Sequence, residues 1–118
     1  MSLFGIGRKR DERRILAIKI ELRSGEKLLP EPLSGAFVTA FSFAEDPTEA
    51  AQKSFRAAIE KGTLAKVLPE GFSLPVHQWR EYIESQWPEF ANQMPAQSEI
   101  GDILSSGAVV FGPLIGFE

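Results

Sequence analysis

Residues 36–62, AFVTAFSFAEDPTEAAQKSFRAAIEKG, contain a strand pattern that runs directly into a helix pattern. In residues 36–43, Phe37, Phe41 and Phe43 fall on one face, and small or short apolar residues fall mostly on the other. This alternation with a period of two predicts a β-strand. Because both of its faces are rather apolar, we expect the strand to be contacted on both sides.

The helix pattern begins at Asp46-Pro47-Thr48-Glu49. An aspartate can accept hydrogen bonds from the free N–H groups of a first helical turn, and proline suits the first helical position. The apolar positions that follow recur at helical spacing, and Gly62 is suited to a left-handed stop. The sequence therefore predicts a helix of about four turns from Pro47 to the residues before Gly62.

On the N-terminal side of this unit, residues 15–23 alternate between apolar and polar side chains, which predicts a half-buried strand. Residues 24–35 contain a turn signal and two prolines, so we expect a loop there. On the C-terminal side, residues 63–68 predict a short strand. Pro69-Glu70-Gly71 is then expected to break the chain, and residues 72–75 are expected to form a loop.

The C-terminal third predicts two helices and a last strand. The first helix opens at Pro75 or Val76 and must end or kink at Pro88, because a proline inside a helix removes a backbone hydrogen bond. A further short helix is expected between Pro95 and Gly107. Residues 108–111 predict a strand, and the apolar tail 112–118 is expected to dock on the domain.

The order strand, strand, helix, strand, helix, optional helix, strand predicts an α+β fold. We expect a two-layer sandwich in which a mixed sheet of about four strands carries two or three helices on one face. This layout is loosely ferredoxin-like, and a likeness of layout alone implies no function.

The 118 residues predict a single domain over residues 15–118, preceded by a flexible basic arm at residues 1–14. The arm holds five basic and two acidic side chains, a net charge of +3. Because the whole chain carries −3, the remaining residues carry −6. An acidic body argues against binding to duplex nucleic acid, which needs clustered Lys and Arg.

Composition also argues against several chemistries. The chain contains no cysteine, which excludes thiol catalysis and cysteine-ligated metals and favours a reducing, cytoplasmic compartment. No apolar run is long enough to span a membrane. His77 is the only histidine, and no nucleophile motif or metal-ligand spacing accompanies it. We therefore expect no catalytic residue, no metal site and no cofactor.

The aromatic side chains are the most distinctive feature of the sequence, which contains nine Phe, two Trp and one Tyr. They either fill the core or, if Phe37, Phe41 and Phe43 point to a sheet face without helices, form an apolar contact surface. In the helix that opens at Pro75 or Val76, the apolar positions Trp79, Tyr82, Ile83 and Trp87 recur at helical spacing, so we call it the aromatic helix. A third possibility is a pocket between this helix and the sheet, with His77 and Trp79 at its mouth.

These observations favour a small non-catalytic binding or regulatory module that acts through a protein partner or through homodimerisation. An inhibitor or immunity-type protein directed against a basic partner is one form of this role, because opposite charge speeds encounter. The alternatives are a small-molecule binder or enzyme that uses the aromatic pocket, and association with nucleic acid or a membrane through the basic arm.

Overall fold

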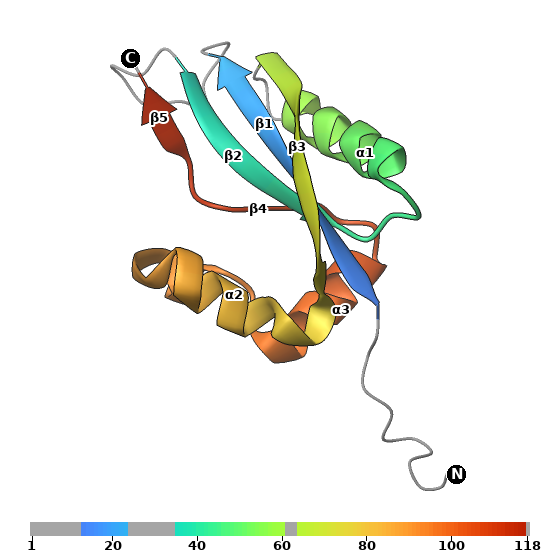
Figure 1. The fold of residues 1–118 in the computed structure, drawn as a ribbon, viewed down its shortest axis with the longest axis vertical. Helices are drawn as coiled ribbons and strands as arrows, with labels where there is room; N and C mark the ends of the chain where they lie inside the picture. Colours follow the sequence, from blue (N-terminus) through green and yellow to red (C-terminus); the bar gives the residue numbers. More distant parts are fainter. Residues whose placement is uncertain (1–12, 24–34, 61–63, 118) are drawn as a thin grey trace, which may run out of the picture.

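The centre of the fold is an antiparallel pair of strands, β1 (Arg14–Arg23) and β2 (Gly35–Ser42), in a computed structural model that describes residues 13–23, 35–60 and 64–117 (Figure 1). Their register runs from Leu16 opposite Ser42 to Arg23 opposite Gly35. Both predicted strands are confirmed. The predicted arm and most of the predicted loop between the strands lie outside the described residues, although Arg14 already belongs to β1.

Helix α1 (Pro47–Glu60) begins where its capping signal predicts. The backbone N–H of Glu49 donates to Oδ1 of Asp46 at 2.8 Å, and the Glu49 carboxylate accepts from the N–H of Glu45 at 2.6 Å. These two bonds satisfy donors that the helix itself leaves free. The predicted stop at Gly62 lies outside the described residues.

Strand β3 (Leu64–Pro75) is longer than predicted, and the expected chain break at residues 69–71 is wrong. Val67 lies opposite Ile20, and Gly71 lies opposite Ile18, so three residues of β3 face Lys19 alone. This bulge accommodates the proline at 69, because a bulged residue needs no ladder hydrogen bond. β3 is also an edge strand, where proline is tolerated.

The chain then forms a helical segment of four pieces: η1 (Val76–Gln78), α2 (Trp79–Gln86), η2 (Pro88–Gln93) and α3 (Gln97–Ser105). The predicted stop at Pro88 is confirmed, since α2 ends two residues before it. The predicted stop at Gly107 is also confirmed, and its φ of 93° is a left-handed conformation that favours glycine.

Two short strands complete the sheet. β4 (Val110–Phe111) and β5 (Ile115–Phe117) both pair with β2, so the apolar tail docks as expected. The strand order is β3-β1-β2-β4, with β5 also on β2. The sequence leaves open whether the last strand pairs beside the first or the third strand, and the structure places both short strands beside β2 instead.

Every described strand pair is antiparallel, so the prediction of a mixed sheet is wrong, whereas the predicted number of about four strands is close to the number described. β2 and β3 do run parallel to each other, as a strand–helix–strand unit requires. They do not pair, because β1 lies between them. The sheet has five strands.

The predicted α+β class is confirmed, and α1 with the sheet forms the expected two-layer sandwich. The expectation that all helices lie on one face is wrong. One core cluster contains Ile18, Ile20 and Val38 with α1, and the other contains Ile15, Ala17 and Phe41 with α2 and α3. Because successive strand residues point to opposite faces, these clusters lie on opposite sides of the sheet. Figure 1 shows α1 well separated from α2 and α3.

Candidate functional site

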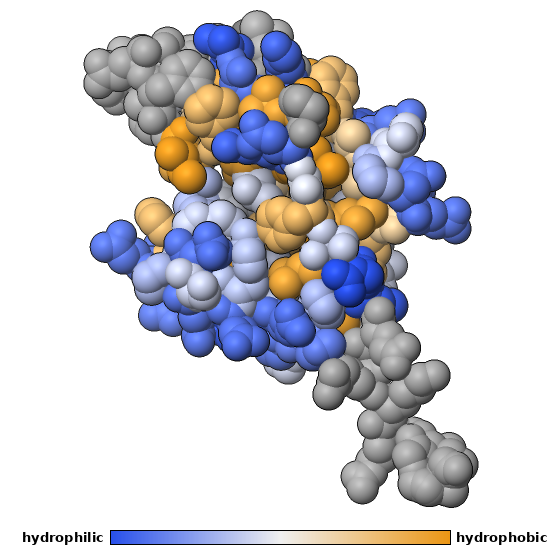
Figure 2. Space-filling model, viewed as in Figure 1, coloured by the Kyte–Doolittle hydropathy of each residue, from blue (hydrophilic) through white to orange (hydrophobic). Residues whose placement is uncertain are grey.

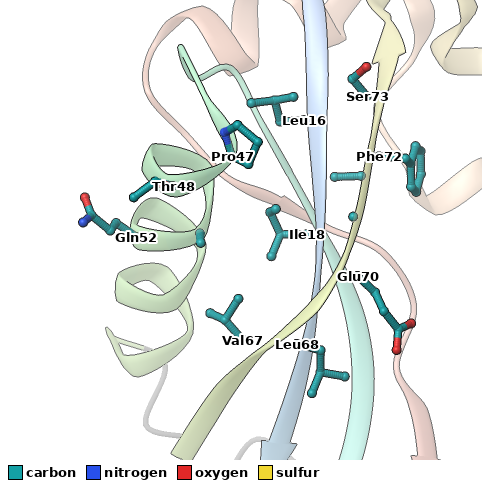
Figure 3. Close-up of a pocket in the computed structure, with 13 residues that line it drawn as sticks. Leu16, Ile18, Pro47, Thr48, Gln52, Val67, Leu68, Glu70, Phe72 and Ser73 are labelled. Atoms are coloured by element: carbon teal, nitrogen blue, oxygen red, sulfur yellow. The ribbon is translucent and has the colours of Figure 1, made fainter.

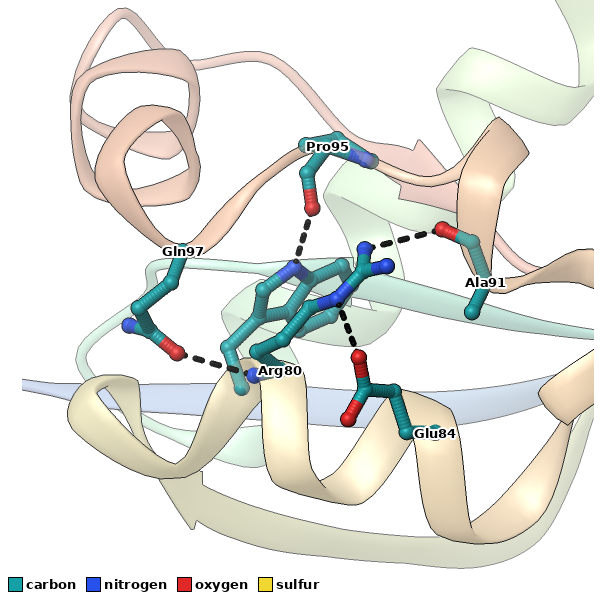
Figure 4. Close-up of polar contacts among 6 residues, drawn as sticks. Arg80, Glu84, Ala91, Pro95 and Gln97 are labelled. Carbon is teal, nitrogen blue, oxygen red and sulfur yellow. Dashed lines mark hydrogen bonds and ion pairs between the residues drawn. The ribbon is translucent and has the colours of Figure 1, made fainter.

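Two of the five residues expected to bind, Phe41 and Trp79, are fully buried, with 0% exposure. Their rings meet edge to face, with centroids 4.9 Å apart. The Trp79 indole Nε1–H donates to the backbone carbonyl of Pro95 at 2.8 Å (Figure 4). Both residues belong to the core on the α2 side of the sheet.

Phe43 and His77 do not line the cavity described next. The guanidinium of Arg13 lies 4.6 Å above the Phe43 ring, and the Phe43 carbonyl accepts a 2.7 Å hydrogen bond from Nζ of Lys53. His77 is exposed in η1. The structure therefore does not bring the five predicted residues together into one site.

Phe37, the fifth residue, lines a cavity of about 320 Å³ between the sheet and the C-terminal end of α2. Four aromatic side chains surround this cavity, which we call the aromatic basin: Phe37, Phe72, Tyr82 and Trp87. They come from β2, β3, α2 and the residue that follows α2. A hollow between the aromatic helix and the sheet thus exists, and residues of the C-terminal end of α2 line it rather than His77 and Trp79.

The rings of the basin hold one another in fixed orientations. The Tyr82 and Trp87 rings are perpendicular, with centroids 5.8 Å apart, and Phe72 lies 5.3 Å from Tyr82. The buried Phe41 ring lies 6.3 Å from Tyr82 and 6.1 Å from Trp87, in edge contact with both. Edge-to-face aromatic pairs add to the stability that burial alone supplies. Phe41 therefore supports the basin without lining it.

Trp87 depends on a glycine for its position. A Cβ at residue 112 would lie 3.1 Å from Cη2 of Trp87, closer than most real contacts, and the Gly112 N–H donates to the carbonyl of Thr39 at 2.8 Å. The absence of a side chain at Gly112 thus lets the indole pack against the segment between β4 and β5.

Arg80 ties α2 to the segments that follow it (Figure 4). Its Nη1 donates to the carbonyl of Ala91 at 2.9 Å, and its Nε pairs with the Glu84 carboxylate at 2.9 Å. Its backbone N–H donates to Oε1 of Gln97 at 2.8 Å. These bonds fix α2 against η2 and α3, so the rings that α2 contributes stand on a rigid support.

Two hydrogen-bond donors of the basin residues have no partner among the described residues. Neither the Tyr82 hydroxyl nor the Trp87 indole N–H bonds to another residue in the described part of the chain. Burial raises the pKa of the Tyr82 hydroxyl above its usual 10.0, so this group stays protonated and able to donate at neutral pH. Both residues are half-buried, so part of each side chain is open to solvent.

One ion pair borders the basin. Nζ of Lys19 lies 3.3 Å from Oε1 of Glu70, and these side chains are 40% and 61% exposed. The same Nζ lies 5.1 Å from the centroid of the Phe37 ring. Exposed ion pairs contribute little to stability, so a charged ligand can replace either partner at small cost.

A second and larger cavity, of about 650 Å³, lies between α1 and β3 (Figure 3). Leu16, Ile18 and Val67 point into it, whereas Gln52 points away. Its lining combines apolar residues with Thr48, Gln52, Glu70 and Ser73. Among the described residues that line it, Phe72 is the one aromatic side chain, against four in the aromatic basin. The basin is therefore the stronger candidate for specific recognition.

The face of the molecule drawn in Figure 2 agrees with this description. In the space-filling view apolar residues gather over the strands, while hydrophilic residues cover α2 (Figure 2). Six large apolar side chains are exposed among the described residues: Phe55, Ile59, Phe72, Phe90, Leu114 and Ile115. Of these, Phe72 and Ile115 line the aromatic basin.

Sequence reasoning missed Phe72 as a site residue because it assigned residues 72–75 to a loop. The alternation Phe72, Ser73, Leu74 is a strand signal that could have revealed it. Tyr82 and Trp87 were recognised only as part of an apolar helix stripe. Nothing in the local sequence indicates that Lys19 borders the same cavity.

Within the described ranges, no group of three or more His, Asp or Glu side chains is placed to hold a metal ion. No helix there is long and apolar enough to cross a membrane.

Comparison of the chain with protein-family models, with curated proteins and with solved structures found no match.

Proposed function

We propose that this chain is a small non-catalytic binding module that acts through protein–protein contact, with the aromatic basin as its contact surface. The basin combines accessible aromatic rings with two hydrogen-bond donors that have no partner among the described residues, and it stands on a rigid support. Tyr and Trp are the side chains that dominate binding energy at protein interfaces, because they offer a large apolar area together with a polar group. This combination is the observation that carries the proposal.

The charge of the chain indicates which partners it favours. Residues 15–118 carry a net charge of −6, which steers basic partners toward the surface and repels acidic ones. An inhibitor-type role against a basic protein is compatible with this negative net charge. The lack of cysteine is compatible with a cytoplasmic setting, which we include in the proposal.

A small-molecule ligand is the second candidate for the same cavity. Its volume of about 320 Å³ is at the lower end of the range for ligand pockets. A metabolite with an aromatic ring and one acidic group could stack on the rings and meet Lys19. The two candidates differ in size of ligand, so they are separable by experiment.

The proposal is tested by co-purification with matched variants. Phe72→Glu places a charge in the basin, whereas Phe90→Glu changes an equally exposed phenylalanine, 39% against 42%, that does not line the basin. We expect a protein partner to be enriched by the wild-type chain and by Phe90→Glu and to be lost with Phe72→Glu. Circular dichroism and thermal unfolding check that both variants fold.

Sedimentation velocity completes the design, because a second copy of the chain is one possible partner. A dimer that dissociates only in Phe72→Glu identifies self-association through the basin. Partners that bind all three proteins equally, or a chain that binds no protein at all, contradict the proposal.

A further inference from the structure

We infer that the aromatic basin recognises an extended proline-rich peptide segment of a partner protein, in the polyproline II conformation and with a basic residue beside the prolines. This inference rests on the proposed function and names the partner's chemistry. Three properties of the basin lead to it: its place on the sheet, its pairing of rings with donors, and its charge.

The place of the basin on the sheet disfavours recognition by strand addition. Phe37 and Thr39 of β2 line the basin, and β2 is already paired with β1 on one side and with β4 and β5 on the other. Phe72 of β3 also lines it, and the outer edge of β3 faces away from β1 and β2. A peptide that covers the basin therefore lies over the face of the sheet rather than along that edge, and it is held by side chains.

The pairing of rings with donors selects the polyproline II conformation. A polyproline II segment has no internal hydrogen bonds, so its carbonyl groups are free to accept. The Tyr82 hydroxyl and the Trp87 indole N–H donate to no group in the part of the chain that the structure describes, and their rings are 5.8 Å apart and perpendicular. Aromatic-lined grooves bind such segments because proline rings pack on aromatic rings and the peptide loses little entropy.

The size of the cavity agrees with a narrow ligand. A volume of about 320 Å³ accepts a few side chains of an extended segment.

The charge of the basin selects a basic neighbour for the prolines. Glu70 is 61% exposed at the edge of the basin, and among the described residues its one ion-pair partner is Lys19. An arginine of the peptide can replace Lys19 and form a two-pronged contact with this carboxylate. The net charge of −6 over residues 15–118 disfavours an acidic peptide at the same place.

The test uses the full chain and two synthetic peptides, each with six prolines and one central residue, either arginine or glutamate. Binding is followed by calorimetry and by tryptophan fluorescence. We expect saturable binding of the arginine peptide and weaker binding of the glutamate peptide. Tyr82→Phe keeps the ring and removes one donor, and it should weaken binding about tenfold.

Two further variants test the preference for a basic residue and the location of the binding site. Glu70→Gln should abolish the preference for the arginine peptide and leave the residual binding of both peptides equal. Phe90→Glu, outside the basin, should bind both peptides like the wild-type chain. The absorbance of the Tyr82 phenolate gives an independent readout, because a donated hydrogen bond should raise the pH of its titration when the arginine peptide is bound.

Failure of this inference is distinguishable from failure of the proposed function. If neither peptide binds at millimolar concentration while a partner protein is still lost with Phe72→Glu, the basin is a contact surface for another kind of segment, and the inference is wrong. Binding of the peptides that Tyr82→Phe and Glu70→Gln leave unchanged also overturns it.

Discussion

Tyr82 is the residue whose chemistry can be followed most directly, since it is the only tyrosine in the chain. Burial raises its pKa above 10.0. We predict that the phenolate absorbance of the folded protein titrates above pH 10, and that denaturant returns the midpoint to about 10. A folded midpoint at or below that of the denatured chain contradicts the described environment of the ring.

The raised pKa of Tyr82 also affects the stability of the fold at alkaline pH. The pKa of Tyr82 is raised in the folded state, so its contribution to stability is fully present below about pH 10 and is lost as the pH rises through the folded pKa. Tyr82→Phe cannot ionise. Its free energy of unfolding should therefore fall less steeply than that of the wild-type chain in this alkaline range.

The five side chains expected to form a binding site differ in what the sequence could reveal about them. Their aromatic character is visible in the sequence, but their exposure is not. Phe41 and Phe37 are four residues apart on one strand face, yet Phe41 is fully buried under α2 and Phe37 borders an open cavity. The difference arises because α2 and α3 cover only one end of that face.

At the scale of elements, α1 and β3 show opposite outcomes of sequence reasoning. The start of α1 depends on a capping group within three residues, so a local signal suffices. The continuation of β3 through Pro69 depends on its pairing with β1, which is distant in sequence. A proline and a glycine two residues apart usually end a strand, but here Pro69 lies in the bulge and Gly71 pairs opposite Ile18.

Gly71 in β3 provides a test of this pairing. A Cβ there would lie 2.7 Å from the carbonyl oxygen of Ala17, too close for a backbone atom that cannot move aside. We predict that Gly71→Ala lowers the free energy of unfolding by about 1–3 kcal/mol. Urea unfolding measures the effect, and Lys66→Ala, at an exposed position of the same strand, should change it by less than about 0.5 kcal/mol. Equal effects of the two variants would argue against the described bulge.

At the scale of the whole molecule, the sheet carries a core on each face. Ile20 belongs to the core beside α1, and Phe41 belongs to the core beside α2 and α3. Both tryptophans of the chain contact Phe41: its ring lies 4.9 Å from Trp79 and 6.1 Å from Trp87. The two cores should therefore give different optical signals when each is perturbed.

We predict that Phe41→Leu and Ile20→Val both destabilise the fold, by about 1–2 and about 0.5–1.5 kcal/mol respectively. Only Phe41→Leu should shift the tryptophan emission of the folded state, because only this change alters the surroundings of the indole rings. An equal shift in Ile20→Val would show that the two cores are not separate. Fluorescence spectra and urea unfolding of the two variants provide the comparison.

The amino-acid sequence by itself determined the features that depend on a few neighbouring residues: the alternation of β1 and β2, the cap at Asp46, and the stops at Pro88 and Gly107. The tertiary structure alone decided the length of β3, the position of the last strands beside β2, and the covering of both sheet faces. It also assembled the aromatic basin. Phe37, Phe72 and Trp87 meet there because strand pairing and helix packing join segments far apart in the chain, and no local propensity specifies which distant segment becomes a neighbour.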